Sequence, residues 1–447
     1  MSAGEAAAPT ADLQAQACEL LSRLIRFNTV NPPGNERPAQ EYLATLLSGA
    51  GFECELLGAT PERPNLIARL RAPEDRDGPT LCYLGHVDTV LADPAEWTHD
   101  PWSGDVADGY VWGRGALDMK SQVAAEIAAA CALGRSGWRP ARGELLVVVV
   151  VDEETGGTLG AEWLTHNHPE RVRCDLLINE GGGALFEYGE ERCYGVCCAE
   201  KGVFRFRVIT SGVAGHASMP AMGDNALLKM GPILDAFAAR QPSYAPTPEA
   251  DAFLAGIGED PADLAAAVAR LRAVNPLMAI LFEPMLGVTF TPTQLTASQK
   301  VNVIPSHAEL RVDCRVPPGL GAEQVRAGIA EVLGDEGAAW RVEFIEEVVG
   351  NRSPVQSELM DVLRALLHER DPDASVVPIV LPGFTDSRHF RAAFPDCVAY
   401  GFFPQRHQPL AASAPLIHGA DERVDVRDLG LAAYVFRELA VRALGSV

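Results

Sequence analysis

Three short apolar runs constrain the fold of this chain more than any other feature of its sequence. The runs are LCYL at 81–84, LLVVVVV at 145–151 and LLI at 176–178, and each is apolar at consecutive positions. Such runs are typical of strands buried on both faces, as in a parallel sheet covered by helices. We therefore expect an α/β fold with a mostly parallel sheet sandwiched by helices.

Helical patterns lie before and between these strands. Residues 20–27, 41–47 and 121–133 have the composition and spacing of helices, and Ser121 is the expected N-cap of the third. The alternation of strands and helices supports the same fold class.

After residue 201 the pattern changes from consecutive to alternating apolar positions. Strands with one solvated face are predicted at 203–210, 310–316 and 340–345, with an amphipathic helix at 323–333. This pattern predicts an inserted α+β domain at 202–348, with the α/β domain formed by 1–201 and 349–447. The insert carries a Pro- and Ala-rich helical elaboration at about 242–286 whose purpose the sequence does not reveal.

Composition excludes several classes of function. The formal net charge of -23 argues against binding to nucleic acid or to an anionic membrane surface. The N-terminal residues do not resemble a secretory signal, and no apolar run approaches the roughly 20 residues that span a bilayer. Ten scattered cysteines without Cys-x-x-Cys spacing predict reduced thiols and a cytoplasmic protein, and the group Cys193, Cys197 and Cys198 lacks a second pair for a tetrahedral metal site.

Each of the three apolar runs leads directly into acidic residues or a histidine. The first leads into His86 and Asp88, the second into DEE at 152–154, and the third into Glu180. Because the carboxyl ends of parallel strands form the ligand crevice of an open α/β sheet, these side chains are predicted to converge.

Taken singly, each of these residues has an ordinary structural explanation. His86 and Asp88 resemble a surface polar pair, Asp118 in GRGALDMK resembles an acid at a helix N-terminus, and His418 resembles a surface histidine. Taken together they supply two imidazoles and three carboxylates, a mixture that suits two divalent ions such as Zn²⁺ with one carboxylate bridging them. The predicted ligands are His86, Asp118, Glu154, Glu180 and His418.

Neighbours of these ligands have predicted roles in the same site. Glu153 adjoins a ligand without being needed as one, which leaves it free to act as a general base toward water. Asp88 lies two residues from His86 and can therefore orient its ring, as carboxylates commonly do for ligating histidines. The histidines favour Zn²⁺, with Co²⁺ or Mn²⁺ as alternatives, over Mg²⁺ or Ca²⁺.

Eight motifs in order resemble one known family. LGHVDTV, GRGALDMK, DEETGG, INEGGG, GHASMP, VNVIP, FTDSRH and IHGADERV are similar to motifs of the co-catalytic zinc amidohydrolases. That family includes aminoacylase, acetylornithine deacetylase, succinyl-diaminopimelate desuccinylase and bacterial glutamate carboxypeptidases. The similarity extends from about residue 21 to about residue 439.

The resemblance implies a role for each matching residue. Asp118 would bridge the metals, His86 and Glu180 would hold one ion, and Glu154 and His418 would hold the other. Glu153 would be the general base and Asp88 the acid that orients its neighbouring histidine.

The inserted domain and the last motifs carry further implied roles. By resemblance, His216 of GHASMP polarises the scissile carbonyl or stabilises its oxyanion, typically across a homodimer interface, and Asn302 and Arg315 hold the substrate. Thr385 and Arg388 line the same site, where Phe384 replaces a glycine common in the family. Without the resemblance, His216 would be read as a loop histidine and Arg315 as a surface charge.

These observations predict a dinuclear metallohydrolase that cleaves the amide bond of N-acyl or N-aminoacyl amino acids. A narrow-specificity deacetylase or desuccinylase of amino-acid biosynthesis is the alternative within that class, and a metal-free binding protein derived from such an enzyme is the alternative outside it. The bulk of Phe384 leaves the preferred acyl group open.

Overall fold

The three apolar runs form neighbouring parallel strands at the centre of a ten-stranded sheet. These strands are β3 (Thr80–His86), β6 (Glu144–Val150) and β7 (Leu176–Asn179). The computed structural model describes residues 7–73, 76–334, 337 and 339–445. All of β6 after its first residue is buried, which is why its sequence is apolar at every position.

The remaining strands extend this centre in both directions. On one side lie antiparallel β2 (Asn65–Arg71) and β1 (Glu53–Leu57). On the other side β19 (Val398–Gly401) pairs parallel with β7 and antiparallel with β9 (Glu191–Glu200). Three further strands pair with β9, namely β8 (Leu185–Tyr188), β17 (Asn351–Arg352) and β18 (Ala374–Leu381).

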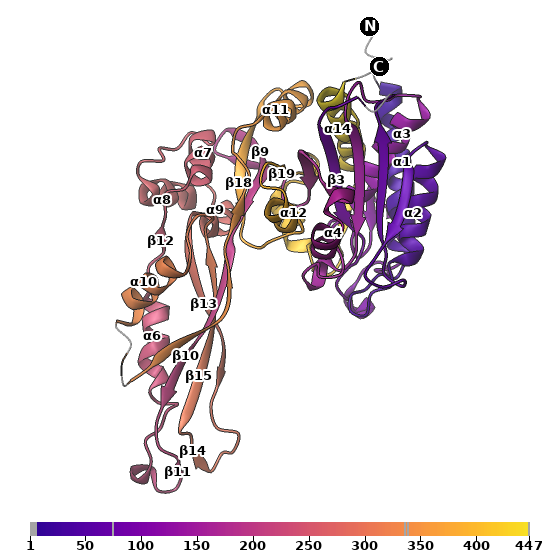
Figure 1. Cartoon of the computed structure of the whole chain (residues 1–447). Helices are drawn as coiled ribbons and strands as arrows, with labels where there is room; N and C mark the ends of the chain where they lie inside the picture. Colours follow the sequence, from indigo (N-terminus) through magenta and orange to yellow (C-terminus); the bar gives the residue numbers. More distant parts are fainter. Residues whose placement is uncertain (1–6, 74–75, 335–336, 338, 446–447) are drawn as a thin grey trace.

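Helices cover both faces of this sheet (Figure 1). One face carries α1 (Ala7–Ile25), α2 (Arg37–Gly49), α3 (Lys120–Arg135) and α14 (Val426–Leu444). The other carries α4 (Ala161–Asn167), α5 (Pro169–Val172) and α12 (Ser387–Ala393), while α11 (Glu358–Arg370) packs on α14 and β18. The predicted α/β class with a mostly parallel, helix-covered sheet is confirmed.

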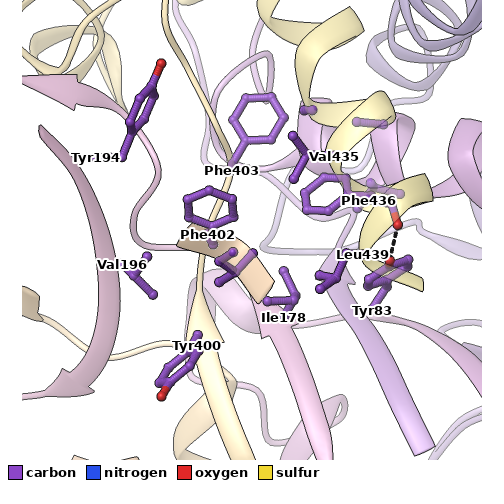
Figure 2. Close-up of a cluster of buried hydrophobic side chains, with 14 of the residues drawn as sticks. Tyr83, Ile178, Tyr194, Val196, Tyr400, Phe402, Phe403, Val435, Phe436 and Leu439 are labelled. Carbon is purple, nitrogen blue, oxygen red and sulfur yellow. Dashed lines mark hydrogen bonds between the residues drawn. The ribbon is translucent and has the colours of Figure 1, made fainter. Parts of the chain in front are cut away.

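The core under α14 shows how the apolar strands and helices pack. Figure 2 shows Ile178 of β7 close to Tyr400 of β19 and to Phe402, which directly follows that strand. Phe436 of α14 belongs to the same cluster. The hydroxyl of Tyr83 donates a hydrogen bond to the main-chain carbonyl of Phe436, which satisfies the only polar atom of a fully buried side chain. The central strands thus pack into a fully buried apolar core.

A five-stranded antiparallel sheet forms the second lobe. Its strands, in spatial order, are β12 (Ser243–Tyr244), β13 (Gly287–Thr296), β15 (His307–Val316), β10 (Gly202–Ser211) and β16 (Arg341–Val348). The helices α6 (Met230–Ala239) and α10 (Ala322–Leu333) pack on one face over a separate apolar core. A small two-stranded antiparallel sheet, formed by β11 (Gly215–His216) and β14 (Val303–Ile304), lies at the far end of this lobe (Figure 1). The α+β class predicted for the insert is confirmed, and this second lobe is called the lid below.

The elaboration pairs with the lid sheet through β12, but its helices pack on the first lobe. It comprises α7 (Pro248–Gly256), α8 (Leu264–Val274) and α9 (Pro276–Phe282). Phe253 and Phe282 belong to the same buried cluster as Val377 of β18, and α7 makes its main contacts with that strand. These helices of the insert therefore cover part of the ten-stranded sheet at β18.

One local prediction is wrong. The third helix begins at Lys120, with Met119 at its N-cap position, so Ser121 lies inside the helix and does not cap it. Its hydroxyl is buried without a hydrogen-bond partner among the described residues. The preceding loop, held by contacts far away in the sequence, sets the start of this helix.

Other observations concern the cysteines and the membrane. Across the described residues all ten cysteines are free thiols, and most are buried. Within the same part of the chain, the helices are too short or too polar to span a bilayer.

Candidate metal centre and active site

The three central strands bring their carboxyl ends to one edge of the sheet. His86 is the last residue of β3, Glu180 directly follows β7, and Glu153 and Glu154 begin the short 3-10 helix η3 (Glu153–Thr155) after β6. Because β6, β3 and β7 are parallel neighbours, their ends lie side by side. The structure thus places these four side chains together.

Asp118 reaches this edge from the loop before α3. Four donors from the loop point at the buried carboxylate of Glu422: Oε1 accepts from the main-chain N–H groups of Leu117 (2.6 Å) and Asp118 (3.0 Å), and Oε2 accepts from the N–H of Gly115 and the guanidinium of Arg114. The supporting role of Glu422 was not predicted from the sequence, because its partners lie about 300 residues away. This carboxylate fixes the direction in which the Asp118 side chain projects.

His418 completes the group from the C-terminal part of the chain. Its side chain is half exposed, its φ angle is +59°, and its carbonyl accepts a hydrogen bond from Arg114. A positive φ is uncommon for a residue other than glycine and clusters at functional positions. The small sheet formed by β4 (Val106–Ala107), β5 (Tyr110–Trp112) and β20 (Arg423–Asp425) joins this segment to the Asp118 loop.

The five side chains form two groups that share Asp118. Asp118 Oδ1 lies 3.2 Å from His86 Nε2, and its other oxygen, Oδ2, lies 3.1 Å from His418 Nε2. Glu180 Oε1 is 3.7 Å from the first imidazole, and Glu154 Oε2 is 3.2 Å from the second. One carboxylate therefore faces two imidazoles, each of which has a second carboxylate beside it.

The donor set fits divalent metal ions. Oε1 of Glu154 is buried and has no hydrogen-bond partner among the described residues, a costly state that a cation would relieve. Burial, together with the charge of Asp118, raises the pKa of Glu180 to about 7. Burial opposes protonation of His86, but the carboxylates of Asp118, Asp88 and Glu180 raise its pKa well above the usual range. The cluster holds excess negative charge that requires protons or cations.

Asp88 positions the acidic turn as well as the histidine. Its carboxylate accepts hydrogen bonds from the main-chain N–H groups of Glu153 and Glu154, both at 3.2 Å, and from Asn31 Nδ2 at 2.9 Å. His86 Nδ1 lies 3.1 Å from the Asp88 carbonyl oxygen and 3.5 Å from its carboxylate. These bonds place Glu153 Oε2 at 3.9 Å from His86 Nε2, on the same side as the predicted ligands.

A second network supports the turn from behind. Asp152, at φ +73°, accepts hydrogen bonds from Thr155, Asn31 and Arg63, and Arg63 Nε also bonds the buried carboxylate of Glu36 at 2.9 Å. The roles of Asn31, Glu36 and Arg63 were not predicted from the sequence, because no motif spacing connects these residues to the site.

Thr385 and Arg388 lie beside the ligand groups. Thr385 lines the cavity next to them and donates a hydrogen bond of 2.6 Å to buried Glu200. Arg388 donates to the carbonyl of Gly156, and its guanidinium lies 3.9 Å from the centre of the Phe384 ring.

The lid residues are not brought to the ligand groups within one chain. His216 is exposed in β11 at the far end of the second lobe, and exposed Asn302 lies next to it, accepting a hydrogen bond from the N–H of Ala217 (Figure 1). Arg315 on β15 is paired with Asp313 at 2.7 Å.

The two-lobed fold and the paired ligand groups together define a protein of the metallopeptidase class. The chain belongs to peptidase family M20/M25/M40, whose family model matches residues 82–442. The resemblance read from the motifs is thereby confirmed.

Individual named relatives match only about half of the chain. A succinyl-diaminopimelate desuccinylase of Ruegeria sp. (strain TM1040) is 33% identical over 235 residues, which cover 52% of this chain and 56% of the relative. The chain thus spans about half the length of the curated relatives it matches.

Solved structures share the fold along nearly the whole chain. An M20 family metallo-carboxypeptidase from Sulfolobus solfataricus has a TM-score of 0.69 and 15% identity, covering 96% of this chain and 99% of that one. A dinuclear metal binding M20 peptidase from Bacillus subtilis has a TM-score of 0.60 and 14% identity, covering 97% and 99%. At these identities the likeness concerns the fold alone.

Proposed function

We propose that this protein is a hydrolase that uses two divalent metal ions to cleave the amide bond of N-acyl or N-aminoacyl amino acids. The observation that carries this proposal is the position of Asp118, whose two oxygens face His86 and His418 at 3.2 and 3.1 Å. A carboxylate shared between two ligand groups suits a pair of ions.

Each ion would have its own ligands besides the shared one. His86 and Glu180 would hold one ion, and Glu154 and His418 the other, with Asp118 between them. When bound, two ions such as Zn²⁺, or Co²⁺ or Mn²⁺ in its place, supply positive charge that polarises a carbonyl and acidifies water. A peptidase with the same fold is described as dinuclear and metal binding, which supports the same pairing here.

Glu153 would move the proton. Its carboxylate lies beside the ligand groups, 3.9 Å from His86 Nε2, and its main chain is fixed by Asp88. In this position it would take a proton from the attacking water and return it to the leaving amine. Asp88 acts as a positioning residue, because it bonds the backbone of the acidic turn.

The lid would complete the site from a second subunit of a homodimer. His216 and Asn302 are neighbours at the far end of the lid, so a partner subunit is the simplest means of bringing them to a substrate (Figure 1). We propose that residues 202–348 form this domain and that Arg315 binds a substrate carboxylate through its planar guanidinium. Thr385 and Arg388 would border the substrate on the first lobe.

Succinyl-diaminopimelate desuccinylase activity is the narrower alternative. Curated relatives with that name support it. The metal ligands do not separate this activity from peptidase or other deacylase activities, because they face only the scissile amide.

Replacement of Glu153 tests the proposed reaction. Glu153→Ala should lower kcat by about three orders of magnitude or more while the bound metal per chain stays at the wild-type value, because the residue handles protons and is not a ligand. Metal content by elemental analysis and turnover of a panel of N-acetyl, N-succinyl and long-chain N-acyl amino acids and dipeptides provide the readouts. A variant that retains most of its turnover would remove Glu153 from the mechanism, and a metal-loaded wild type inactive on the whole panel would remove the function.

A further inference from the structure

A cavity of about 420 Å³ extends from the predicted metal ligands into the first lobe. Its walls come from the ends of β8, β9 and β18, from α9, and from residues 403–418. Small-molecule sites are typically about 300–1,000 Å³, so the cavity has room for a substrate group beyond the scissile amide.

The wall away from the ligands is apolar. Phe186 of β8 and Phe282 of α9 pack with ring centroids 4.6 Å apart, and Leu281, Leu381 and Leu410 line the remaining sides. Phe282 is buried in the cluster that joins the elaboration to β18, which gives this wall a fixed position. The elaboration thus supplies one side of the cavity.

Charge is confined to the metal end of the cavity. Its charged or titratable lining consists of Glu153 and four of the predicted ligands, namely Asp118, Glu154, Glu180 and His418. His86, the fifth predicted ligand, is not part of the lining. No lysine or arginine lines it among the described residues. Arg388, three residues beyond Thr385 of the lining, is engaged with the Gly156 carbonyl and the Phe384 ring. An anionic group placed in the apolar part of this cavity, away from the proposed metal ions, would lose its hydration without gaining a cation.

Apart from Glu154 at the metal end, one buried side chain of the lining has an unpaired polar atom among the described residues. Gln405 is 6% exposed, lines the cavity, and its Nε2 has no hydrogen-bond partner in the part of the chain that the structure describes. Its main chain is anchored to Gly183 and Leu185, which lie just beyond Glu180. A buried N–H without an acceptor is unfavourable, so a substrate oxygen that accepts a hydrogen bond from Nε2 of Gln405 would strengthen substrate binding.

We propose that this cavity binds an uncharged hydrocarbon group of the substrate and that Gln405 donates a hydrogen bond to an oxygen at its polar end. This inference rests on the proposed amide hydrolysis and specifies its substrate class. The preferred substrates carry a long aliphatic acyl chain or a large apolar side chain, and a short anionic group such as succinyl is disfavoured.

A substrate series on the metal-loaded enzyme tests the proposal. N-Acetyl-, N-butanoyl-, N-hexanoyl- and N-octanoylglycine should show kcat/KM rising up to about fourfold with each buried methylene, and N-succinylglycine should fall below N-butanoylglycine. N-Acetylleucine and N-acetylphenylalanine form the second arm, because a rise there with no chain-length effect assigns the cavity to the amino-acid side chain.

The results distinguish failure of the cavity assignment from failure of the proposed hydrolase function. Activity that is highest on N-succinyl substrates and indifferent to hydrocarbon length in both arms would overturn the cavity assignment and leave amide hydrolysis intact. Inactivity on every compound would instead overturn the proposed function.

A cation introduced into the wall gives a sharper test. Leu281→Arg and Leu410→Arg replace half-buried leucines of the lining, and each should lower kcat/KM for N-octanoylglycine at least about tenfold and raise it for N-succinylglycine. Leu264→Arg is the matched control, because Leu264 is a half-buried leucine of the same elaboration outside the cavity. Equal effects of all three substitutions on both substrates would contradict the proposal.

Gln405→Met separates substrate binding from a structural role. The substitution keeps the side-chain length and removes the unpaired N–H, so the melting temperature should stay equal or rise while kcat/KM for N-octanoylglycine falls about tenfold. Unchanged kcat/KM would exclude Gln405 as a donor to the substrate.

Discussion

At the scale of single residues, the site depends on side chains that hold the predicted ligands as much as on the ligands themselves. Glu422 illustrates this point, because its carboxylate accepts four hydrogen bonds from the loop that carries Asp118. Asp88 does the same for the turn that carries Glu153 and Glu154. Outer residues of this kind fix the orientation of metal ligands in other sites.

Glu422→Gln should weaken metal binding about 10- to 100-fold, because an amide NH₂ would face N–H donors and Arg114 would lose its buried counter-charge. Competition with a chromophoric chelator measures the dissociation constants. Asp421→Asn, which changes the adjacent acid bonded to Thr98, is the control and should bind metal as the wild type does. Equal affinity in Glu422→Gln would show that the loop holds its position without this carboxylate.

At the scale of elements, patterns within one segment were predictable and contacts between distant segments were not. The central strands follow from consecutive apolar residues, and the convergence of His86, Glu154 and Glu180 follows from strands that end at one edge. Asp118 and His418 do not lie at strand ends of the sheet and were predicted from the combination of imidazoles and carboxylates. The family resemblance was needed to divide the five ligands between two ions. Gln405, Glu422 and the packing of 242–286 on β18 were missed, since composition does not say which distant surface an apolar or polar residue meets.

The junction between the two sheets contains a buried lysine with a pH-dependent effect on stability. Lys201 lies between β9 and β10 and donates hydrogen bonds of 2.6 Å to the carbonyls of Pro284 and Gly287. Burial lowers its pKa from 10.5 to about 7. Between these values the unfolded chain keeps the proton that the folded protein releases, so Lys201 makes the free energy of unfolding rise with pH in this window.

Lys201→Met removes this contribution. From pH 7 to pH 9 the wild type should gain stability relative to the variant, by at most ~1.4 kcal/mol per pH unit, as measured by chemical denaturation. Lys300→Met alters an exposed lysine and should follow the wild type. A wild type that gains nothing on Lys201→Met over this range would contradict a lowered pKa for this lysine.

At the scale of the whole molecule, the two lobes are suited to sharing a site between subunits. The far end of the lid exposes apolar side chains around the small β11–β14 sheet, including Met222 at 71% and Val301 at 100% exposure. Exposed apolar residues that gather in one region mark interaction surfaces. The same region carries His216, so burial of this surface in a homodimer would also place that histidine near a second chain.

Mixed dimers test this sharing. His216→Ala and Glu153→Ala should each be inactive alone, but mixing them through reversible dissociation should restore about a quarter of the wild-type activity, because half of the dimers then contain one intact site. Scattering or ultracentrifugation confirms the oligomeric state of each sample. Mixtures that stay inactive although mixed dimers form, or a fully active monomer, would contradict a role for His216 across the interface.

In the proposed site, Asp118 lies between two metal ions. An anomalous-difference map from crystals grown with Zn²⁺ measures this directly. We expect two peaks, one between His86 and Glu180 and one between Glu154 and His418, with an Asp118 oxygen on each. A single peak, or no peak among these side chains, would contradict a dinuclear site.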